Sequence, residues 1–189
     1  LHSVIKRGPE QLARIYEGAV SSGTNLFFYQ QQSGSTNDVL YVFNGTTSQP
    51  LDTVPSSLLN PYTLIPLPGN KVLYMGHSAA TGFELFVSDG TLPGTTMVKD
   101  INPGSTTSFG SPFPVFLGFE FNGKAYFTAD DGVSGLELWS SDGTTANTQL
   151  FTDFNPAGSS FSLGFAWAKN ANRFLVNVIG GSQKGIVTS

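Results

Sequence analysis

The sequence predicts an all-β fold built from one repeated unit, and three observations support that prediction. The motif at residues 84–91 (ELFVSDGT) returns 53 residues later at 137–144 as ELWSSDGT, and a more divergent copy, VLYVFNGT, precedes both at 39–46. Repetition at a period of about 50 residues indicates an array of one supersecondary unit. No segment shows helical periodicity with capping residues, and 22 glycines and 11 prolines disfavour long helices.

Each unit is expected to begin with two antiparallel strands joined by a tight turn. The first strand of each unit is expected at residues 12–16, 62–67, 115–121 and 163–168. The second is a run of aromatic and β-branched residues at 25–29, 71–75, 124–128 and 173–177. Each of these runs is entered through Gly or Asn, which is typical of a strand that follows a turn.

The repeated motif is predicted to form the third strand of each unit, with large side chains on both faces. Leu85 alternates with Phe86, for example, as expected for a sheet packed between two others. Asn-Gly or Asp-Gly then closes a hairpin, because Gly adopts positive φ without steric cost. The fourth strand follows at 95–101 or 148–154, and Asn-Pro ends it. Units of four short strands at this period predict the blades of a β-propeller.

The two ends of the sequence predict how the ring closes. Residues 185–189 align with the third strand, so the fourth unit has no outer strand, whereas residues 3–6 form a surplus strand at the other end. We expect this N-terminal strand to complete the last blade, which gives four blades of four antiparallel strands without an exposed sheet edge. The chain is then a single domain, 1–189, with repeats at 8–54, 55–107, 108–160, and 161–189 plus 1–7. The alternative is a larger propeller with further repeats beyond Ser189.

Composition and charge exclude several classes of partner and site. The net charge is −4 and no basic cluster occurs, so nucleic acid is not expected as a partner. The sequence has no cysteine and two histidines, so we expect no disulfide, no cofactor and no transition-metal site. No apolar run reaches the length of a membrane span. Only 12% of the residues are charged, and this neutral polar composition favours an extracellular or cell-surface protein.

The repeat resembles that of the bacterial ELWxxDGT family. The motif at 137–144 matches the family pattern, as do residues 129–132 (ADDG) and 99–104 (KDINPG). The match is good over 69–159, whereas the first unit carries DVLY at 38–41 in the third strand and the fourth unit is degenerate. The resemblance implies a secreted or surface-associated bacterial protein, often a large one, and it implies no set of catalytic residues.

The acidic residues of the repeat have two possible roles. Asp89 and Asp142 precede the hairpin glycines, and we interpret both as turn formers, because Asx side chains hydrogen-bond to the backbone of their own turn. Asp130 and Asp131 lie between the second and third strands, where clustered carboxylates can also bind Ca²⁺. The equivalent loop at 77–82 carries no acid. We therefore expect a solvated loop, with an isolated Ca²⁺ site as the alternative.

A binding surface is expected at one mouth of the propeller, on the loops that follow the second strands. The candidate contact residues are Gln31, His77, Asp130, Asp131, Phe109 and Phe161. The two phenylalanines come from the loops that lead into the first strands, and we expect them to form an apolar rim for a partner.

The expected function is a non-enzymatic binding or scaffold module that contacts protein or glycan at the cell surface, alone or within a larger assembly. His77 has Ser78 beside it, but no orienting acid or nucleophile motif surrounds the pair, so we expect no catalytic residue. The alternative is a hydrolase or lyase acting on polysaccharide, which needs two or three carboxylate or histidine side chains in one pocket. The candidates for that pocket are Asp38, His77, Asp130 and Asp131.

Overall fold

The structure of the protein is a computed structural model that describes residues 19–31, 37–55, 63–104, 107–109, 116–156, 158–161, 167–178 and 185–188. These residues form 15 β-strands in four antiparallel sheets, and they contain no helix. Within these ranges, no helix is long and apolar enough to cross a membrane. The predicted all-β fold is confirmed.

The strands of each sheet follow one another in chain order. The first sheet contains β1 (Val20–Ser22), β2 (Asn25–Gln31), β3 (Asn37–Phe43) and β4 (Ser48–Pro55). The second contains β5 (Ile65–Leu67), β6 (Lys71–Ser78), β7 (Gly82–Ser88) and β8 (Thr96–Lys99). The third contains β9 (Gly118–Phe121), β10 (Lys124–Asp130), β11 (Leu136–Ser141) and β12 (Gln149–Thr152). The fourth sheet has three strands in the described part of the chain, β13 (Trp167–Lys169), β14 (Phe174–Val178) and β15 (Gly185–Thr188).

The hydrogen-bonding register shows that the sheets are copies of one unit. Leu73 lies opposite Val87 in the second sheet, and the equivalent Leu175 lies opposite Thr188 in the fourth. Each four-stranded sheet also shifts register between its third and fourth strands at the same place in the repeat. These bulges lie at Leu40/Tyr41, Leu85/Phe86 and Leu138/Trp139. The repeat predicted from the motif is therefore a repeat of geometry as well as of sequence.

Alternate side chains of the second strands pack against the two neighbouring sheets. In β6, Val72 and Tyr74 belong to a core cluster shared with the first sheet. Leu73 and Met75 belong to a second cluster shared with the third sheet. All four side chains are fully buried. In the third strand β7, Leu85 belongs to the second of these clusters and Phe86 packs against the first, which confirms the expectation that this strand carries large apolar residues on both faces.

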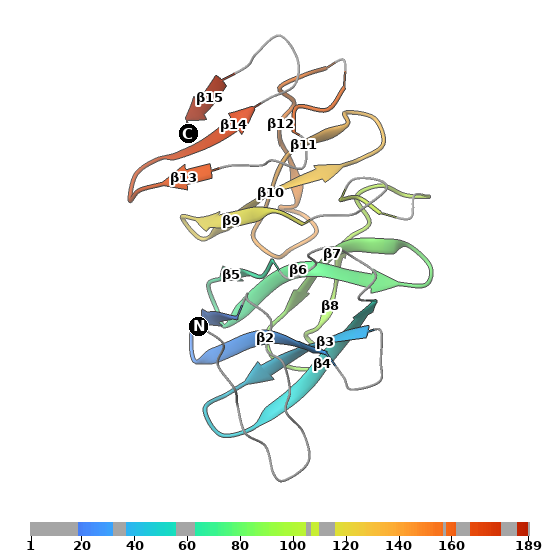
Figure 1. Ribbon diagram of the computed structural model, residues 1–189, viewed down its shortest axis with the longest axis vertical. Coiled ribbons are helices and arrows are strands. Elements are labelled where there is room, and N and C mark those ends of the chain that lie inside the picture. Colours follow the sequence, from blue (N-terminus) through green and yellow to red (C-terminus); the bar gives the residue numbers. More distant parts are fainter. Residues whose placement is uncertain are drawn as a thin grey trace.

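The four sheets are stacked in chain order along the longest axis of the molecule (Figure 1). The short first strands lie side by side, with β5 between β1 and β9. The Ser22 hydroxyl donates to the Leu67 carbonyl at 2.7 Å and so joins β1 to β5. Gly118 permits the close approach of β9 to β5, because a Cβ atom there would lie 2.6 Å from Cδ1 of Ile65.

The row of sheets is open in the described part of the chain. The first sheet lies at one end and the fourth at the other, so these strands do not close into the four-bladed ring expected from the sequence (Figure 1). The expected closing strand at residues 3–6 lies outside the described residues. Counting strands identifies the units of the array, but it does not set the rotation between neighbouring sheets, and that rotation decides how many blades close a ring.

The predicted hairpin turns are confirmed between the third and fourth strands. The φ angles of Gly45, Gly90 and Gly143 are 94°, 90° and 86°, in the left-handed region that favours glycine. In the third sheet, Oδ1 of Asp142 accepts hydrogen bonds from the Thr144 N–H at 3.0 Å and from its hydroxyl at 2.7 Å. Asp89 makes the same two bonds in the second sheet. Both acids are turn formers, as interpreted from the sequence.

The glutamate of the repeated motif is buried and joins the third strand to the segment that leads to the next sheet. Glu84 accepts hydrogen bonds from the Ile101 N–H at 2.9 Å and from the Ser108 hydroxyl at 2.6 and 2.7 Å. The equivalent Glu137 accepts from the Phe154 N–H at 3.0 Å. Burial raises the pKa of both carboxyls, although these hydrogen bonds oppose the rise. The motif glutamate therefore has a structural role.

Candidate functional site

The two ends of the second strands present different groups to solvent. We call the end with the β1–β2, β5–β6, β9–β10 and β13–β14 turns the turn end, which lies to the left in Figure 1. The opposite end, where the second strands lead into the third strands, is the loop end. The binding surface expected from the sequence lies at the loop end.

Gln31, His77 and Asp130 occupy equivalent positions at the loop end of β2, β6 and β10. They lie opposite Asp38, Phe83 and Leu136 on the third strands, and the His77 ring centroid is 4.7 Å from that of Phe83. Each belongs to a different sheet, and packed sheets lie about 10 Å apart. Across the ranges that the structure covers, no group of three or more His, Cys, Asp or Glu side chains could hold a metal ion.

Asp130 and Asp131 hydrogen-bond to the backbone of their own loop. Oδ1 of Asp130 accepts from the Gly132 N–H at 2.7 Å. Oδ1 of Asp131 accepts from the N–H groups of Val133 and Ser134 at 2.9 and 2.7 Å, and its Oδ2 accepts from the Ser134 hydroxyl at 3.2 Å. Burial favours the neutral form of Asp131, but these donors outweigh it and lower its pKa. These bonds form the turn of a solvated loop, as expected from the sequence, and Val133 within it is 90% exposed.

Phe109 and Phe161 are core residues, which corrects the expectation that they form an apolar rim. Their side chains are 1% and 4% exposed. The Phe109 ring packs on Phe116 at a centroid distance of 5.1 Å, and the Phe161 ring on Phe154 at 6.0 Å. Both follow the serine that accompanies the buried motif glutamate, Ser108 or Ser160. A loop position suggests exposure, but Ser108 is held by its hydrogen bond to Glu84 and Ser160 by its N–H bond to the Leu136 carbonyl at 3.1 Å, and the aromatic ring that follows each serine enters the core.

A pocket of about 330 Å³ lies at the turn end, between the β9–β10 turn and the β13–β14 turn. It is an open hollow whose volume lies near the lower limit for small-molecule sites, and it carries a few placed polar groups. Its lining residues are Glu120, Phe121, Asn122, Lys169, Asn170 and Ala171. The pocket is thus formed by two neighbouring sheets, at the opposite end of the strands from the expected surface.

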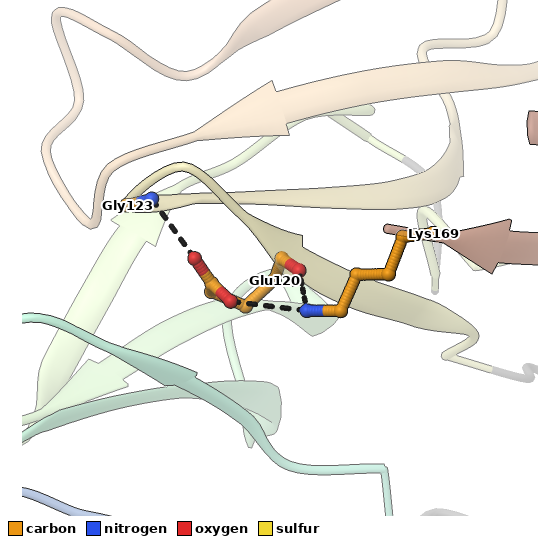
Figure 2. A network of polar contacts seen from close by, with 3 residues as sticks. All are labelled: Glu120, Gly123 and Lys169. Atoms are coloured by element: carbon orange, nitrogen blue, oxygen red, sulfur yellow. Dashed lines mark hydrogen bonds and ion pairs between the residues drawn. The ribbon is translucent and has the colours of Figure 1, made fainter. Parts of the chain in front are cut away.

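An ion pair crosses this pocket from one sheet to the other. Nζ of Lys169 lies 3.1 Å from Oε2 of Glu120 and also donates to the Glu120 carbonyl oxygen (Figure 2). Oε1 of Glu120 accepts from the Gly123 N–H at 2.9 Å in the β9–β10 turn. Burial works against ionisation of Glu120, but the Gly123 and Lys169 donors outweigh it and lower its pKa. The side chains of Lys169 and Glu120 are 35% and 30% exposed, so both remain accessible to a ligand.

Asn170 organises the second wall of the pocket. Its Oδ1 atom accepts hydrogen bonds from the N–H groups of Asn172 and Arg173 at 2.9 and 3.0 Å and shapes the β13–β14 turn. The amide nitrogen of Asn170 takes no part in these bonds. On the first wall, Asn122 has a φ of 50°, a conformation that Asn tolerates better than most residues. Two turn asparagines therefore flank the ion pair.

A partly exposed aromatic side chain lies along the strand from the pocket. Trp167 is 45% exposed and stacks on Phe119 at a centroid distance of 4.7 Å and an interplanar angle of 25°. It precedes Lys169 by two residues on β13, so both side chains are on the same face of the fourth sheet. Sequence reasoning missed this site because Glu120 and Lys169 belong to different units. The available signal was an asparagine in or beside each of two turns between first and second strands.

No protein-family model matches the chain, and no curated protein matches it. Among solved structures, the chain is similar to one from a structural and mechanistic study of two prolyl endopeptidases and their inter-domain dynamics. The TM-score is 0.52 at 12% sequence identity, over 87% of this chain. The chain spans about a quarter (24%) of the length of that prolyl endopeptidase. At this identity the likeness shows the fold alone.

Proposed function

We propose that the four sheets are consecutive blades of a β-propeller. Three features support this architecture: the four-stranded repeat, the adjacent first strands β1, β5 and β9, and the likeness in fold to a prolyl endopeptidase, which has a propeller. The open row of sheets favours the larger ring, the alternative expected from the sequence (Figure 1). Blades that complete such a ring would come from the rest of a longer chain or from a second copy.

We further propose that the protein is a non-enzymatic binding module that contacts protein or glycan at the turn end. The observation that carries this proposal is the pocket between the third and fourth sheets, where accessible polar groups of both signs meet in one concavity. A fold of this kind hosts enzymes and binding proteins alike, so the function is argued from the pocket. An extracellular or cell-surface location and kinship with ELWxxDGT repeats belong to the same proposal, supported by the neutral polar composition and the motif.

The geometry at the loop end gives less support to the polysaccharide hydrolase or lyase. Asp38 is fully buried on β3, and Asp130 and Asp131 are engaged by their own loop. Paired carboxylates in glycosidases lie about 5–9.5 Å apart around the scissile bond. His77 lies near the carboxyl of Asp52, whose Oδ2 is already engaged by the Tyr74 hydroxyl at 2.8 Å.

A screen against a glycan array and a displayed library of random peptides tests the binding proposal. The wild-type chain is compared with a turn-end variant, Asn122→Asp with Asn170→Asp, and with a loop-end variant, His77→Gln with Asp130→Asn. We expect a ligand whose binding is lost in the turn-end variant and kept in the loop-end variant. If binding is lost only in the loop-end variant, the binding site lies at the loop end, as expected from the sequence. Release of reducing ends from a polysaccharide would support the enzyme instead.

A further inference from the structure

We propose that the turn-end pocket binds a neutral saccharide, through hydroxyl hydrogen bonds to Glu120, Lys169 and Asn170 and through ring stacking on Trp167. This inference rests on the proposed binding function and names its ligand class. It follows from the charge balance of the pocket, its inventory of donors and acceptors, and the aromatic surface beside it.

The charge balance of the pocket favours a neutral ligand. Glu120 and Lys169 are the charged groups of its lining, and they form an ion pair with each other. An anionic ligand placed here would approach the Glu120 carboxylate, and a cationic one would approach the Lys169 ammonium. Either ligand would gain from one charge and be repelled by the other at similar distance. A neutral polar molecule meets neither penalty.

Donors and acceptors are interleaved around the pocket. A carboxylate has about four acceptor positions, and the Gly123 N–H and Lys169 use one each on Glu120. Lys169 has three N–H donors, of which two go to Glu120. The Asn170 amide nitrogen supplies two further donors, because only its oxygen is used in the turn. A ligand that fits must therefore donate and accept at neighbouring atoms, as each sugar hydroxyl does.

Trp167 adds the apolar surface that a sugar ring requires. The C–H groups on one face of a sugar ring are apolar, whereas its hydroxyls point outward at the edge. Trp167 is 45% exposed, and its stacking on Phe119 holds the ring in a fixed orientation. Because Trp167 and Lys169 share a face of β13 about 6.6 Å apart, one sugar ring can stack on the indole while a neighbouring hydroxyl reaches the ion pair.

The protein contains two tryptophans, so a single-tryptophan variant can report on the pocket. Trp139→Phe removes the other indole and introduces the residue type found at the equivalent position of the second sheet, Phe86. Its fluorescence is then that of Trp167. The probes are neutral gluco-, galacto- and manno-oligosaccharides, with oligogalacturonate as the anionic comparison and triglycine as the peptide comparison. We expect a saturable change in Trp167 emission with at least one neutral oligosaccharide, and binding at least 10-fold weaker for oligogalacturonate.

Asn170→Asp in this background tests the site itself, because Asp keeps the turn acceptor and removes both amide donors. Asn44→Asp is the matched control. Oδ1 of Asn44 likewise accepts from the N–H groups two and three residues on, at 3.0 and 2.9 Å, in the first sheet. We expect Asn170→Asp to weaken oligosaccharide binding at least 10-fold and Asn44→Asp to leave it unchanged. Asn122→Asp is a second pocket variant should Asn170→Asp unfold.

Three results would overturn the inference. The first is that no neutral oligosaccharide changes the Trp167 emission. The second is that Asn170→Asp and Asn44→Asp weaken oligosaccharide binding equally. A saturable response to triglycine alone would identify the pocket as a peptide site, which rejects the saccharide and leaves the proposed binding function standing. If neither the glycan array nor the peptide library yields a ligand for the wild-type chain, the proposed function fails together with this inference.

Discussion

Two neighbouring residues stabilise the hairpin turn of the repeat, Asp142 through its side chain and Gly143 through its backbone conformation. The Thr144 hydroxyl is the main cause of the lowered pKa of Asp142, so the carboxylate is ionised and committed to the turn. Gly143, the residue after Asp142, adopts the positive φ of 86° that the turn requires. Because Asn44 and Gly45 form the amide version of the same turn, the conformation does not depend on a negative charge.

Replacing Gly143 by Val should lower the free energy of unfolding by about 1–3 kcal/mol, because a β-branched residue resists positive φ. Its Cβ atom would also lie 3.2 Å from Cδ1 of Leu67 and 3.4 Å from Cγ2 of Val87 in the second sheet. Urea unfolding measures the change, and Gly143→Asn, which tolerates this φ better, should cost less. Equal stability of the Val variant and the wild type would show that the turn does not use this conformation in solution.

At the scale of elements, a buried carboxylate fixes the end of the second and third units to their third strands. Glu84 is fully buried and accepts hydrogen bonds from Ile101 and Ser108, which lie on the segment between the second and third sheets. That segment also carries Phe109 into the core. The element therefore combines a polar anchor with an apolar one, and removal of the polar anchor leaves two buried donors without an acceptor.

Glu84→Ala should destabilise the protein by about 2 kcal/mol or more, because each unsatisfied buried donor costs about 1–3 kcal/mol. Glu120→Ala is the comparison, since it breaks a partly exposed ion pair of a kind that contributes about 1 kcal/mol or less. Chemical unfolding of both variants tests the difference. A Glu84→Ala effect no larger than that of Glu120→Ala would mean that the segment finds other partners.

The stability contributed by Glu84 should decrease as the pH rises. Burial is the main cause of its raised pKa, and the nearby Asp100 adds to the rise. The folded state therefore holds the proton more tightly than the unfolded chain, whose Glu pKa is about 4.3. The stability that Glu84 contributes is therefore fully present below the unfolded-state pKa. It is lost as the pH rises through the higher pKa of Glu84 in the folded state.

A series of unfolding measurements from acidic to neutral pH, on the wild type and on Glu84→Gln, isolates this contribution. The stability of the wild type relative to Glu84→Gln should fall with increasing pH, because Gln does not ionise. Glu137→Gln should behave in the same way, since burial also raises the pKa of Glu137. A wild-type advantage that grows with pH would contradict the assignment.

At the scale of the whole molecule, the unit was predictable from sequence and the assembly of units was not. Spacing and turn chemistry identified the second and third strands, including β15, which the alignment of 185–189 with the motif predicted. The first strand of the first sheet lies at Val20–Ser22 and not at the expected residues 12–16. The open row was missed because the rotation between sheets depends on packed side chains of two units at once. The pocket was missed for a similar reason, because Glu120 and Lys169 carry no motif and meet only when two first strands lie side by side.

The row also predicts an order of local stability among the sheets. In β6, residues 72–76 are all buried between two neighbouring sheets, whereas in β14 Leu175 is half-buried and Asn177 is exposed. Both strands hydrogen-bond on either side, so the difference between them is the burial of their faces. An array with ends opens from its ends, because a terminal unit has one neighbour while an inner unit has two.

Native-state amide hydrogen exchange should therefore show higher protection in β6 and β10 than in β14. The β14 amides should exchange through partial opening of the fourth sheet, at a free energy below that of global unfolding. Mass spectrometry of peptides covering each second strand resolves the three strands, and the denaturant dependence of exchange separates partial from global opening. Equal protection of β6, β10 and β14 would indicate that all four sheets unfold together. That is the behaviour expected of a closed ring, which has no terminal blade.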